Sequence, residues 1–259
     1  MNKIALVVFS IFVVSVIALL TYYHINKYAY SKELRHTPQY HEQDSILTIA
    51  IIGDSWVNGN VMDSLLYKTL LDKNVKSKTI SSGEGGATSK QVYQNLFKDS
   101  LDVVSSKFIL NAKPDYCIVL VGVNDSALQY GGHFYSYHLR LIIKTLLEQN
   151  IKPVILSLPE FGIRETTKNL RFVSKIRNKI SSIINNDKAT DEIKDYRETF
   201  LNEFKQEGLS HKIIYVNFDK VTKDYYSNPE LYSNSSHLSQ IGNQKLVSVL
   251  ADAIMKHQR

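Results

Sequence analysis

The sequence has a single cysteine, Cys117, among its 259 residues, so no intramolecular disulfide can form. Cys117 lies inside an apolar run from Tyr116 to Val121. A nucleophilic cysteine needs an exposed, electropositive setting that favours the thiolate, whereas free cysteines are among the most buried residues. We therefore predict a buried, inert thiol and exclude cysteine-based catalysis.

The sequence also lacks a dense Lys/Arg tract, although its formal net charge is +6. Scattered basic residues differ from the clustered patch or stripe of a nucleic-acid-binding protein, so we expect no nucleic-acid partner. No group of His, Asp and Glu residues has the spacing of metal ligands. We expect chemistry that uses neither a metal nor an organic cofactor.

No internal repeat or low-complexity tract is present, and 44% apolar with 22% charged residues is typical of a globular protein. From Ser45 onward, apolar runs typical of buried strands alternate with segments of helical spacing. Strands are predicted at 46–52, 75–80, 116–121, 153–158 and 212–216. Helices are predicted at 61–71, 91–110, 133–148, 170–184, 191–204 and 241–255. This alternation indicates a mainly parallel sheet with helices on both faces, which is a three-layer α/β/α sandwich.

The prediction of the helix at 91–110 depends on a long apolar face. The helix at 91–110 would bury five residues at helical spacing, namely Val92, Leu96, Leu101, Val104 and Phe108. This face predicts one continuous helix between the second and third strands.

The N-terminal segment 4–20 is almost wholly apolar and is followed by Tyr22 and Tyr23. A bilayer requires about 17–25 such residues, and tyrosines suit the membrane–water interface. No small-x-small cleavage site follows Leu20, so an uncleaved, single-pass anchor is favoured over a cleaved signal peptide. We interpret 1–23 as the anchor, 24–45 as a polar linker and 46–259 as the folded domain.

The orientation of this anchor depends on its flanking charges. Lys3 and the α-amino group favour an N-terminus inside the cell, whereas Lys27, Lys32 and Arg35 oppose it. Because N-terminal anchors usually export the domain that follows, we predict an extracytoplasmic domain, in the periplasm or at the cell surface.

Polar and glycine-rich segments follow the first three predicted strands, at 53–55, 81–88 and 122–125. In an open parallel sheet, ligands bind outside the carboxyl ends of the strands, so these segments should meet at one edge. His237 belongs to a fourth segment, 234–237, in the loop before the last helix, from where it can reach the same edge.

The residue types in these segments suit acyl transfer by a serine nucleophile. Ser55 would attack, and His237 would take its proton and return it to the leaving group. Glycines at 83, 85 and 86 allow close approach of the backbone to a ligand. The N–H of Ser55, the N–H of one of these glycines and the side-chain amide of Asn124 would form an oxyanion hole. The Gly-x-Ser-x-Gly elbow of α/β-hydrolases is absent around Ser55.

Together, Gly53-Asp54-Ser55, the glycine turn, Gly122-Val123-Asn124-Asp125 and the His237 segment resemble the SGNH (GDSL-type) hydrolase family. The resemblance covers roughly residue 46 to the C-terminus. It implies Ser55 as the nucleophile, Gly86 and Asn124 as oxyanion donors, and His237 as the base. Ser81 stands where the family usually has an asparagine, which leaves the backbone N–H of Gly86 unaffected.

The resemblance is incomplete at Asn234, which stands where the family usually has an aspartate three residues before its histidine. Such an aspartate fixes the histidine tautomer and stabilises the imidazolium. Asn234 can orient the ring but supplies no charge. Three interpretations are open: a working Ser55–His237 dyad supported by Asn234 or by a backbone carbonyl, another carboxylate such as Asp219 or Glu230 in place of the aspartate, or a weak or degenerate enzyme used for binding. We count Asn234 with Ser55 and His237 among the predicted catalytic residues.

The resemblance implies an ester hydrolase that works through an acyl-enzyme, and the N-terminal segment adds a membrane anchor and an extracytoplasmic location. We favour O-acyl groups, chiefly O-acetyl, on a glycan or a small acylated molecule. An O-acetyltransferase and a lipid esterase are alternatives, although the sequence shows no obvious apolar rim for lipids. A non-catalytic glycan-binding or scaffold domain is the alternative of another class. The oligomeric state is left open.

Aromatic residues near the predicted site allow two interpretations. Trp56, the only tryptophan, is expected in the core rather than stacked on a sugar. Tyr225, Tyr226 and Tyr232 precede His237 and either line a substrate groove or pack at the surface.

Overall fold

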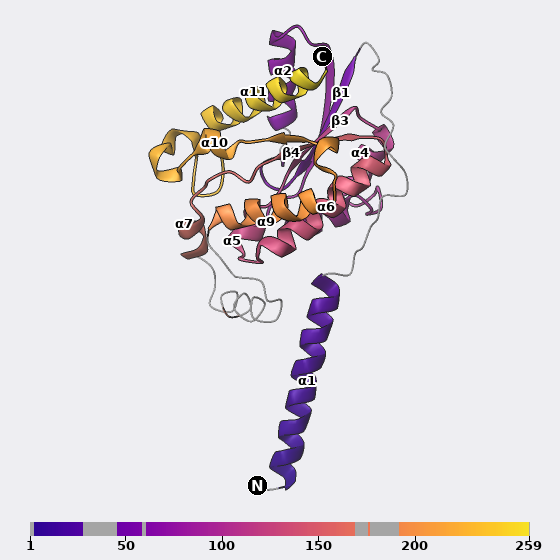
Figure 1. Ribbon diagram of the computed structural model, residues 1–259, viewed down its shortest axis with the longest axis vertical. Coiled ribbons are helices and arrows are strands. Elements are labelled where there is room, and N and C mark those ends of the chain that lie inside the picture. The colour runs from indigo at the N-terminus through magenta and orange to yellow at the C-terminus, as the bar shows by residue number, and fades with distance from the viewer. Residues whose placement is uncertain (1–2, 28–45, 59–60, 169–175, 177–191, 259) are drawn as a thin grey trace.

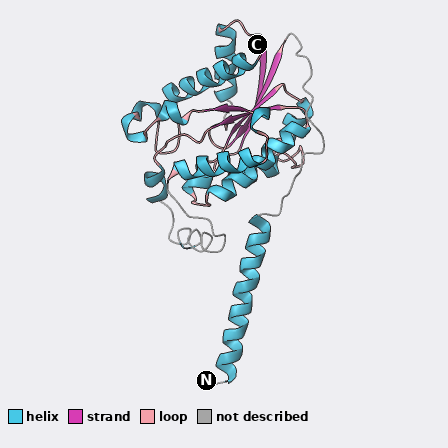
Figure 2. Ribbon diagram, viewed as in Figure 1, coloured by secondary structure: helices cyan, strands magenta, loops and turns pink. Residues whose placement is uncertain are grey.

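The computed structural model describes residues 3–27, 46–58, 61–168, 176 and 192–258. Its centre is a parallel sheet of five strands in the order β2-β1-β3-β4-β5 (Figures 1 and 2). The strands are β1 (Leu47–Gly53), β2 (Ser77–Gly83), β3 (Tyr116–Leu120), β4 (Lys152–Leu156) and β5 (Ile214–Val216). This is the flavodoxin-like order, in which the chain switches direction between β1 and β3. The predicted α/β fold class is confirmed.

Helices cover both faces of the sheet (Figure 1). On one side lie α2 (Val61–Asp72) and α11 (Gln240–His257), which contact each other. On the other lie α3 (Ser89–Asn95), α6 (Gly132–Glu148) and α9 (Ile193–Gln206), with α6 in contact with both others. Shorter helices are α4 (Lys107–Ala112), α5 (Val123–Ala127), α7 (Ile163–Lys168) and α10 (Asp219–Thr222). Single 3₁₀ turns span Ser210–Lys212, Tyr225–Ser227 and Pro229–Leu231.

The core follows from the apolar runs seen in the sequence. Every residue of β3 is buried, as are six of the seven residues of β1, because both strands are covered by helices on two faces. The register aligns the carboxyl ends of three strands, since Gly53 of β1 pairs with Gly83 of β2 and with Leu120 of β3. The loops that follow these strands therefore start from one edge.

The predicted helix at 91–110 is wrong. Two short helices, α3 and α4, replace it, and a turn-rich loop joins them. In that loop the carboxylates of Asp99 and Asp102 accept the N–H groups of Leu101 (3.0 Å) and Val104 (3.1 Å). Such local side-chain bonds compete with helix formation. As a result Leu101 is 91% exposed and Phe108 44% exposed, so neither belongs to a buried helical face.

The other predicted elements are found with shifted ends. The second strand runs over 77–83 rather than 75–80, and the fifth begins at Ile214 after a 3₁₀ turn. The predicted helix at 170–184, apart from residue 176, and nearly all of the predicted linker lie outside the described residues.

The N-terminal helix α1 (Lys3–Lys27) is long and apolar enough to cross a membrane, by length and composition. Its 18-residue window Ala5–Tyr22 has a mean hydropathy of 2.6 and packs against no other part of the described structure. The hydroxyls of Ser10 and Thr21 donate to carbonyls one turn earlier, at 2.9 Å each, so both are satisfied within the helix. These properties fit a membrane anchor and a signal sequence equally.

Candidate active site

Two glycines let the serine turn approach the neighbouring strands closely. A Cβ on Gly53 would lie 2.2 Å from the carbonyl oxygen of Leu120, and one on Gly83 would lie 2.7 Å from the backbone nitrogen of Asn58. Any larger residue would therefore displace backbone at either position. The turn at 54–58 is held tightly between the ends of β2 and β3.

The side chain of Asp54 organises this turn from inside. Asp54 is buried and accepts the N–H of Trp56 at 3.0 Å and the side-chain amide of Asn124 at 3.2 Å. Its carbonyl accepts the N–H groups of Val57 (3.0 Å) and Asn58 (3.2 Å). Ser55, between two anchored neighbours, is left half-buried with its side chain directed at the histidine loop.

The structure brings Ser55 and His237 together, although 182 positions separate them in the sequence. The Oγ of Ser55 lies 3.0 Å from the Nε2 of His237. This separation is within the range for a nucleophile hydrogen-bonded to its base.

Asn234 lies behind the histidine ring, as the sequence predicts. Its Oδ1 is 3.0 Å from the Nδ1 of His237, and it also accepts the backbone N–H groups of Ser236 and His237, both at 3.0 Å. Two backbone donors converge on this atom, so it must be the amide oxygen. The Nδ1 facing it therefore carries the ring proton, which leaves the Nε2 lone pair free to accept from Ser55.

No carboxylate among the described residues is hydrogen-bonded to His237. The carboxylate of Asp219 accepts the hydroxyl of Ser157, and the Asp219 N–H donates to the same Oγ at 3.0 Å. Glu230 participates through its carbonyl, which accepts the hydroxyl of Ser239. Neither of the substitute acids considered from the sequence is brought to the histidine.

The three predicted oxyanion donors lie in the segments that follow β1, β2 and β3 at one edge of the sheet. Gly86 has φ +78° and open space around its α-carbon. No described residue accepts a hydrogen bond from the N–H of Ser55 or of Gly86, so both remain available. Asn124 is different, because its amide nitrogen already donates to Asp54 at 3.2 Å and to the Ala87 carbonyl at 2.9 Å. Its use as a donor requires exchange of one of these bonds.

Trp56 has a role that sequence reasoning missed. It is 9% exposed, as expected for a core residue, yet its indole N–H donates to the carbonyl of Ser236 at 2.8 Å. One indole thus joins the serine turn to the loop that carries His237. A lone tryptophan next to the serine was the only sequence signal, and it gave no partner.

Two further carboxylates lie inside the fold near the serine turn. Burial raises the pKa of Asp54 from 3.8 to about 7, and the negative charge of Asp125 adds to the rise. Burial likewise raises the pKa of Asp125 to about 6, although Ser89 donates both its N–H (2.9 Å) and its hydroxyl to it. Both groups hold loops in place, and neither contacts the histidine among the hydrogen bonds of the described residues.

No group of three or more His, Cys, Asp or Glu side chains is placed to hold a metal ion within the part of the chain that the structure describes.

Comparison with known proteins identifies the fold through structure. No family model matches the sequence, and no curated protein matches it. A lipase/acylhydrolase from Enterococcus faecalis superposes with a TM-score of 0.57 at 18% identity, covering 82% of this chain and 96% of the other. A GDSL-like lipase from Bacteroides thetaiotaomicron gives 0.56 at 14% identity, covering 92% and 98%.

A Clostridium thermocellum family 3 carbohydrate esterase gives a TM-score of 0.55 at 16% identity, covering 82% of this chain and 96% of the other. These matches cover most of this chain and nearly all of each of the other three. At such low identity the likeness concerns the fold. The chain thus has the α/β fold of the GDSL- and SGNH-type lipases and esterases.

Proposed function

We propose that this chain is a serine ester hydrolase with Ser55 as nucleophile and His237 as base. The observation that carries the proposal is the 3.0 Å contact between Ser55 Oγ and His237 Nε2, at an edge where the Ser55 and Gly86 N–H groups have no described acceptor. A nucleophile, a base and unoccupied donors at one place are the parts that acyl transfer requires.

The first half-reaction follows from this geometry. His237 Nε2 takes the hydroxyl proton of Ser55 while Oγ bonds to the carbonyl carbon of the ester. The carbonyl π electrons move onto oxygen, and the N–H groups of Ser55 and Gly86 stabilise the resulting oxyanion. Asn124 contributes if it releases Asp54 or Ala87. Removing one such donor typically costs about 2.7–4 kcal/mol of transition-state stabilisation.

Acylation is completed when His237, which acted as a base during attack, acts as an acid toward the leaving alcohol, and the second half-reaction is then hydrolysis of the acyl-enzyme. The tetrahedral intermediate collapses, the bond to the alcohol oxygen breaks, and His237 gives its proton to that oxygen. An acyl-Ser55 ester remains. Water, deprotonated by His237, then attacks the acyl carbon. The bond from that carbon to Ser55 Oγ breaks, His237 returns the proton to Oγ, and the acid leaves, which restores Ser55. Transfer to an acceptor sugar would replace water by a sugar hydroxyl in this last step.

Asn234 sets the rate that this site can reach. Its oxygen holds the imidazole in the required tautomer, which is the orienting part of the usual aspartate's role. It brings no negative charge to the imidazolium formed during attack. We therefore propose a working dyad with a slower turnover than a full triad.

For the substrate we propose an O-acylated, chiefly O-acetylated, glycan, with α1 holding the domain (46–259) at an extracytoplasmic membrane surface. The similarity to a carbohydrate esterase supports the substrate class. The length and composition of α1 support the anchor.

A lipid esterase is the second candidate, and one observation favours it. Leu101 is 91% exposed and Val103 99% exposed in the loop between α3 and α4, with Phe97 49% exposed nearby. A surface with several exposed apolar side chains in one loop would suit contact with lipid better than a surface with single, scattered ones. Comparing acetyl with long-chain acyl esters separates the candidates, because a lipid esterase should prefer the long chain.

The test is hydrolysis of p-nitrophenyl acetate by the full chain in detergent. Ser55→Ala and His237→Ala should each lower kcat by about 10³-fold or more, since nucleophile and base act as one unit. Ser64→Ala, at an exposed serine of α2, is the matched control and should keep full activity. If the wild type is no faster than Ser55→Ala, the chain is not a simple esterase, and a non-catalytic glycan-binding role replaces the proposal.

A further inference from the structure

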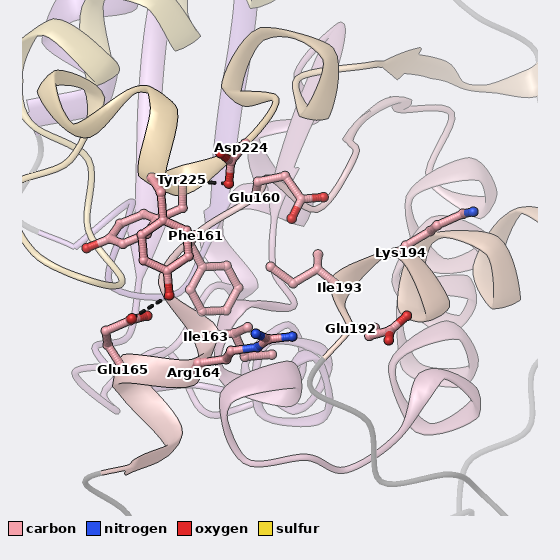
Figure 3. Close-up of a pocket in the computed structure, with 11 residues that line it drawn as sticks. Glu160, Phe161, Ile163, Arg164, Glu165, Glu192, Ile193, Lys194, Asp224 and Tyr225 are labelled. Carbon is pink, nitrogen blue, oxygen red and sulfur yellow. Dashed lines mark hydrogen bonds between the residues drawn. The ribbon is translucent and has the colours of Figure 1, made fainter.

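A pocket of about 250 Å³ lies outside the Ser55–His237 contact, and Figure 3 shows the residues that line it. Its walls come from the segment after β4, from the beginnings of α7 and α9, and from the 3₁₀ turn Tyr225–Ser227. Drug-sized ligands usually occupy pockets of about 300–1,000 Å³. The volume therefore suits a single small ring rather than an extended chain.

Direct contacts join this pocket to the histidine loop. The N–H of Gly162 donates to the carbonyl of Ser235 at 2.7 Å, and the hydroxyls of Thr166 and Ser235 are 2.9 Å apart. A Cβ on Gly162 would lie 2.9 Å from both the Ser235 side chain and the Tyr225 ring, so the three segments are in close contact. The pocket wall thus abuts the loop two residues before His237.

The pocket combines apolar surface with hydrogen-bond acceptors. Phe161 and Ile193 form buried apolar surface (Figure 3). Tyr226 is 63% exposed, and its ring meets that of Tyr225 edge-on, with the ring centroids 5.2 Å apart. The hydroxyl of Tyr226 donates to Glu165 and thereby lowers the pKa of that carboxyl, which keeps it ionised. A sugar ring needs this combination, because its C–H face packs on aromatic rings and its hydroxyls donate to carboxylates.

The lining charges restrict which sugar fits. Two cations, on Arg164 and Lys194, face four carboxylates, on Glu160, Glu165, Glu192 and Asp224. Ion pairs tie Glu160 to Arg197 (2.6 Å) and Lys194 to Glu198 (3.5 Å). The excess of carboxylates repels an anionic ligand and accommodates a neutral or cationic one.

We propose that this pocket binds the alcohol part of the substrate, an uncharged or amine-bearing sugar ring whose O-acyl group reaches Ser55. The proposal rests on the hydrolase function proposed above. His237 must hand its proton to the leaving alcohol, so that part of the ester has to lie on the histidine side of Ser55. The pocket lies against that side. The acyl part then extends toward Gly86 and Asn124.

The experiment compares two kinds of acetyl ester on the full chain in detergent. p-Nitrophenyl acetate carries no sugar and reports on Ser55 and His237 alone. The 3-O-acetyl esters of methyl glucoside, methyl glucosaminide and methyl glucuronide report on the pocket. The variants are Tyr226→Ala, Tyr226→Phe and, as a matched control, Tyr67→Ala at a 44% exposed tyrosine of α2.

Tyr226→Ala should lower kcat/KM about tenfold on the glucoside and glucosaminide esters and leave p-nitrophenyl acetate unchanged. Tyr226→Phe, which keeps the ring, should retain most of the activity, and Tyr67→Ala should match the wild type. The wild type should cleave the glucuronide ester at least tenfold more slowly than the glucosaminide ester.

The assignment is overturned if Tyr226→Ala affects no sugar ester, or affects p-nitrophenyl acetate equally, while Ser55-dependent cleavage persists. If p-nitrophenyl acetate is not cleaved in a Ser55-dependent way, the hydrolase proposal fails instead. Sugar binding is then decided by saturation-transfer NMR with methyl glucosaminide. A signal that Tyr226→Ala removes supports the pocket, and no signal from the wild type ends the proposal.

Discussion

The two loops that meet at the Ser55–His237 contact are built in different ways. The serine turn is held by close backbone packing at Gly53 and by the buried carboxylate of Asp54. The histidine loop is half-exposed and is organised around one amide oxygen, that of the exposed Asn234. The nucleophile is thus positioned by the core, whereas its base depends on a local side-chain turn.

The two loops also differ in the carboxyl groups that lie near them. Asp54 and Asp125 are both buried beneath the serine side and serve as hydrogen-bond acceptors for the backbone and for Asn124. Among the described residues no carboxylate is hydrogen-bonded to His237. Carboxyl groups therefore hold the loops on the serine side, whereas none is hydrogen-bonded to the histidine, where a negative charge would stabilise the imidazolium.

The largest expected effect concerns the serine side, where the titration of Asp54 should make the stability of the protein depend on pH. The pKa of Asp54 is raised from 3.8 to about 7, so between these values the folded state binds a proton that the unfolded state has released. The free energy of unfolding should consequently fall by on the order of 3 kcal/mol as pH rises from 5 to 8. Urea denaturation of the full chain in one detergent, at several pH values, measures it.

Asp54→Asn is the control for this pH effect, because it keeps an oxygen acceptor and removes the titration. Its profile should be flatter than that of the wild type over the same range. Parallel profiles for the two proteins would show that Asp54 does not titrate between pH 5 and 8, and therefore that burial does not raise its pKa into this range.

The next effect is on turnover, at the histidine side. Asn234→Asp should raise kcat on p-nitrophenyl acetate about tenfold, because a carboxylate stabilises the imidazolium that Asn234 cannot. The gain should be far below the 10⁴-fold loss known for the reverse change in a serine protease, since this position is exposed.

Asn234→Ala is the matched variant for that experiment. It removes the acceptor of two backbone N–H groups and of the ring, so its kcat should fall below the wild-type value. Equal rates in all three proteins would mean that the histidine is positioned by something other than residue 234.

The smallest effect concerns the link between the two sides. Trp56→Phe keeps an aromatic ring in the core and removes the 2.8 Å bond to the Ser236 carbonyl. We expect kcat to fall about threefold, as for loss of a hydrogen bond worth about 0.5–1.5 kcal/mol, with little change in KM. A change in KM alone, with kcat kept, would argue that Trp56 contacts substrate instead of holding the histidine loop.

Much of the fold could be predicted from the sequence because the patterns that define its strands are local. The apolar runs that became β1 and β3 are buried on both faces, and such runs mark strands of a parallel sheet. The location of the site could be predicted in the same way, because the polar residues that follow these strands meet at one edge of a parallel sheet. The sheet order places the Ser55 turn at this edge, and the position of His237 depends further on the turn around Asn234 and on the bond from Trp56.

The parts that were missed depend on single hydrogen bonds. Asp99 and Asp102 interrupt the expected helix by accepting nearby N–H groups, which a periodic apolar pattern does not register. The bond from Trp56 to Ser236 spans 180 positions, and no spacing rule predicts it. The pocket at Tyr226 likewise needs segments from α7 and α9 that meet only in three dimensions.

Cys117 can serve as a built-in chemical probe of how often the central sheet opens. It is fully buried in β3, between Ala50 of β1 and Pro153 of β4, and burial raises the pKa of its thiol far above the usual range. Thiol reagents react with thiolate, so the folded protein should remain unlabelled. Labelling requires the central strand to separate from its neighbours. The modification rate of this one cysteine therefore measures how often the middle of the sheet opens.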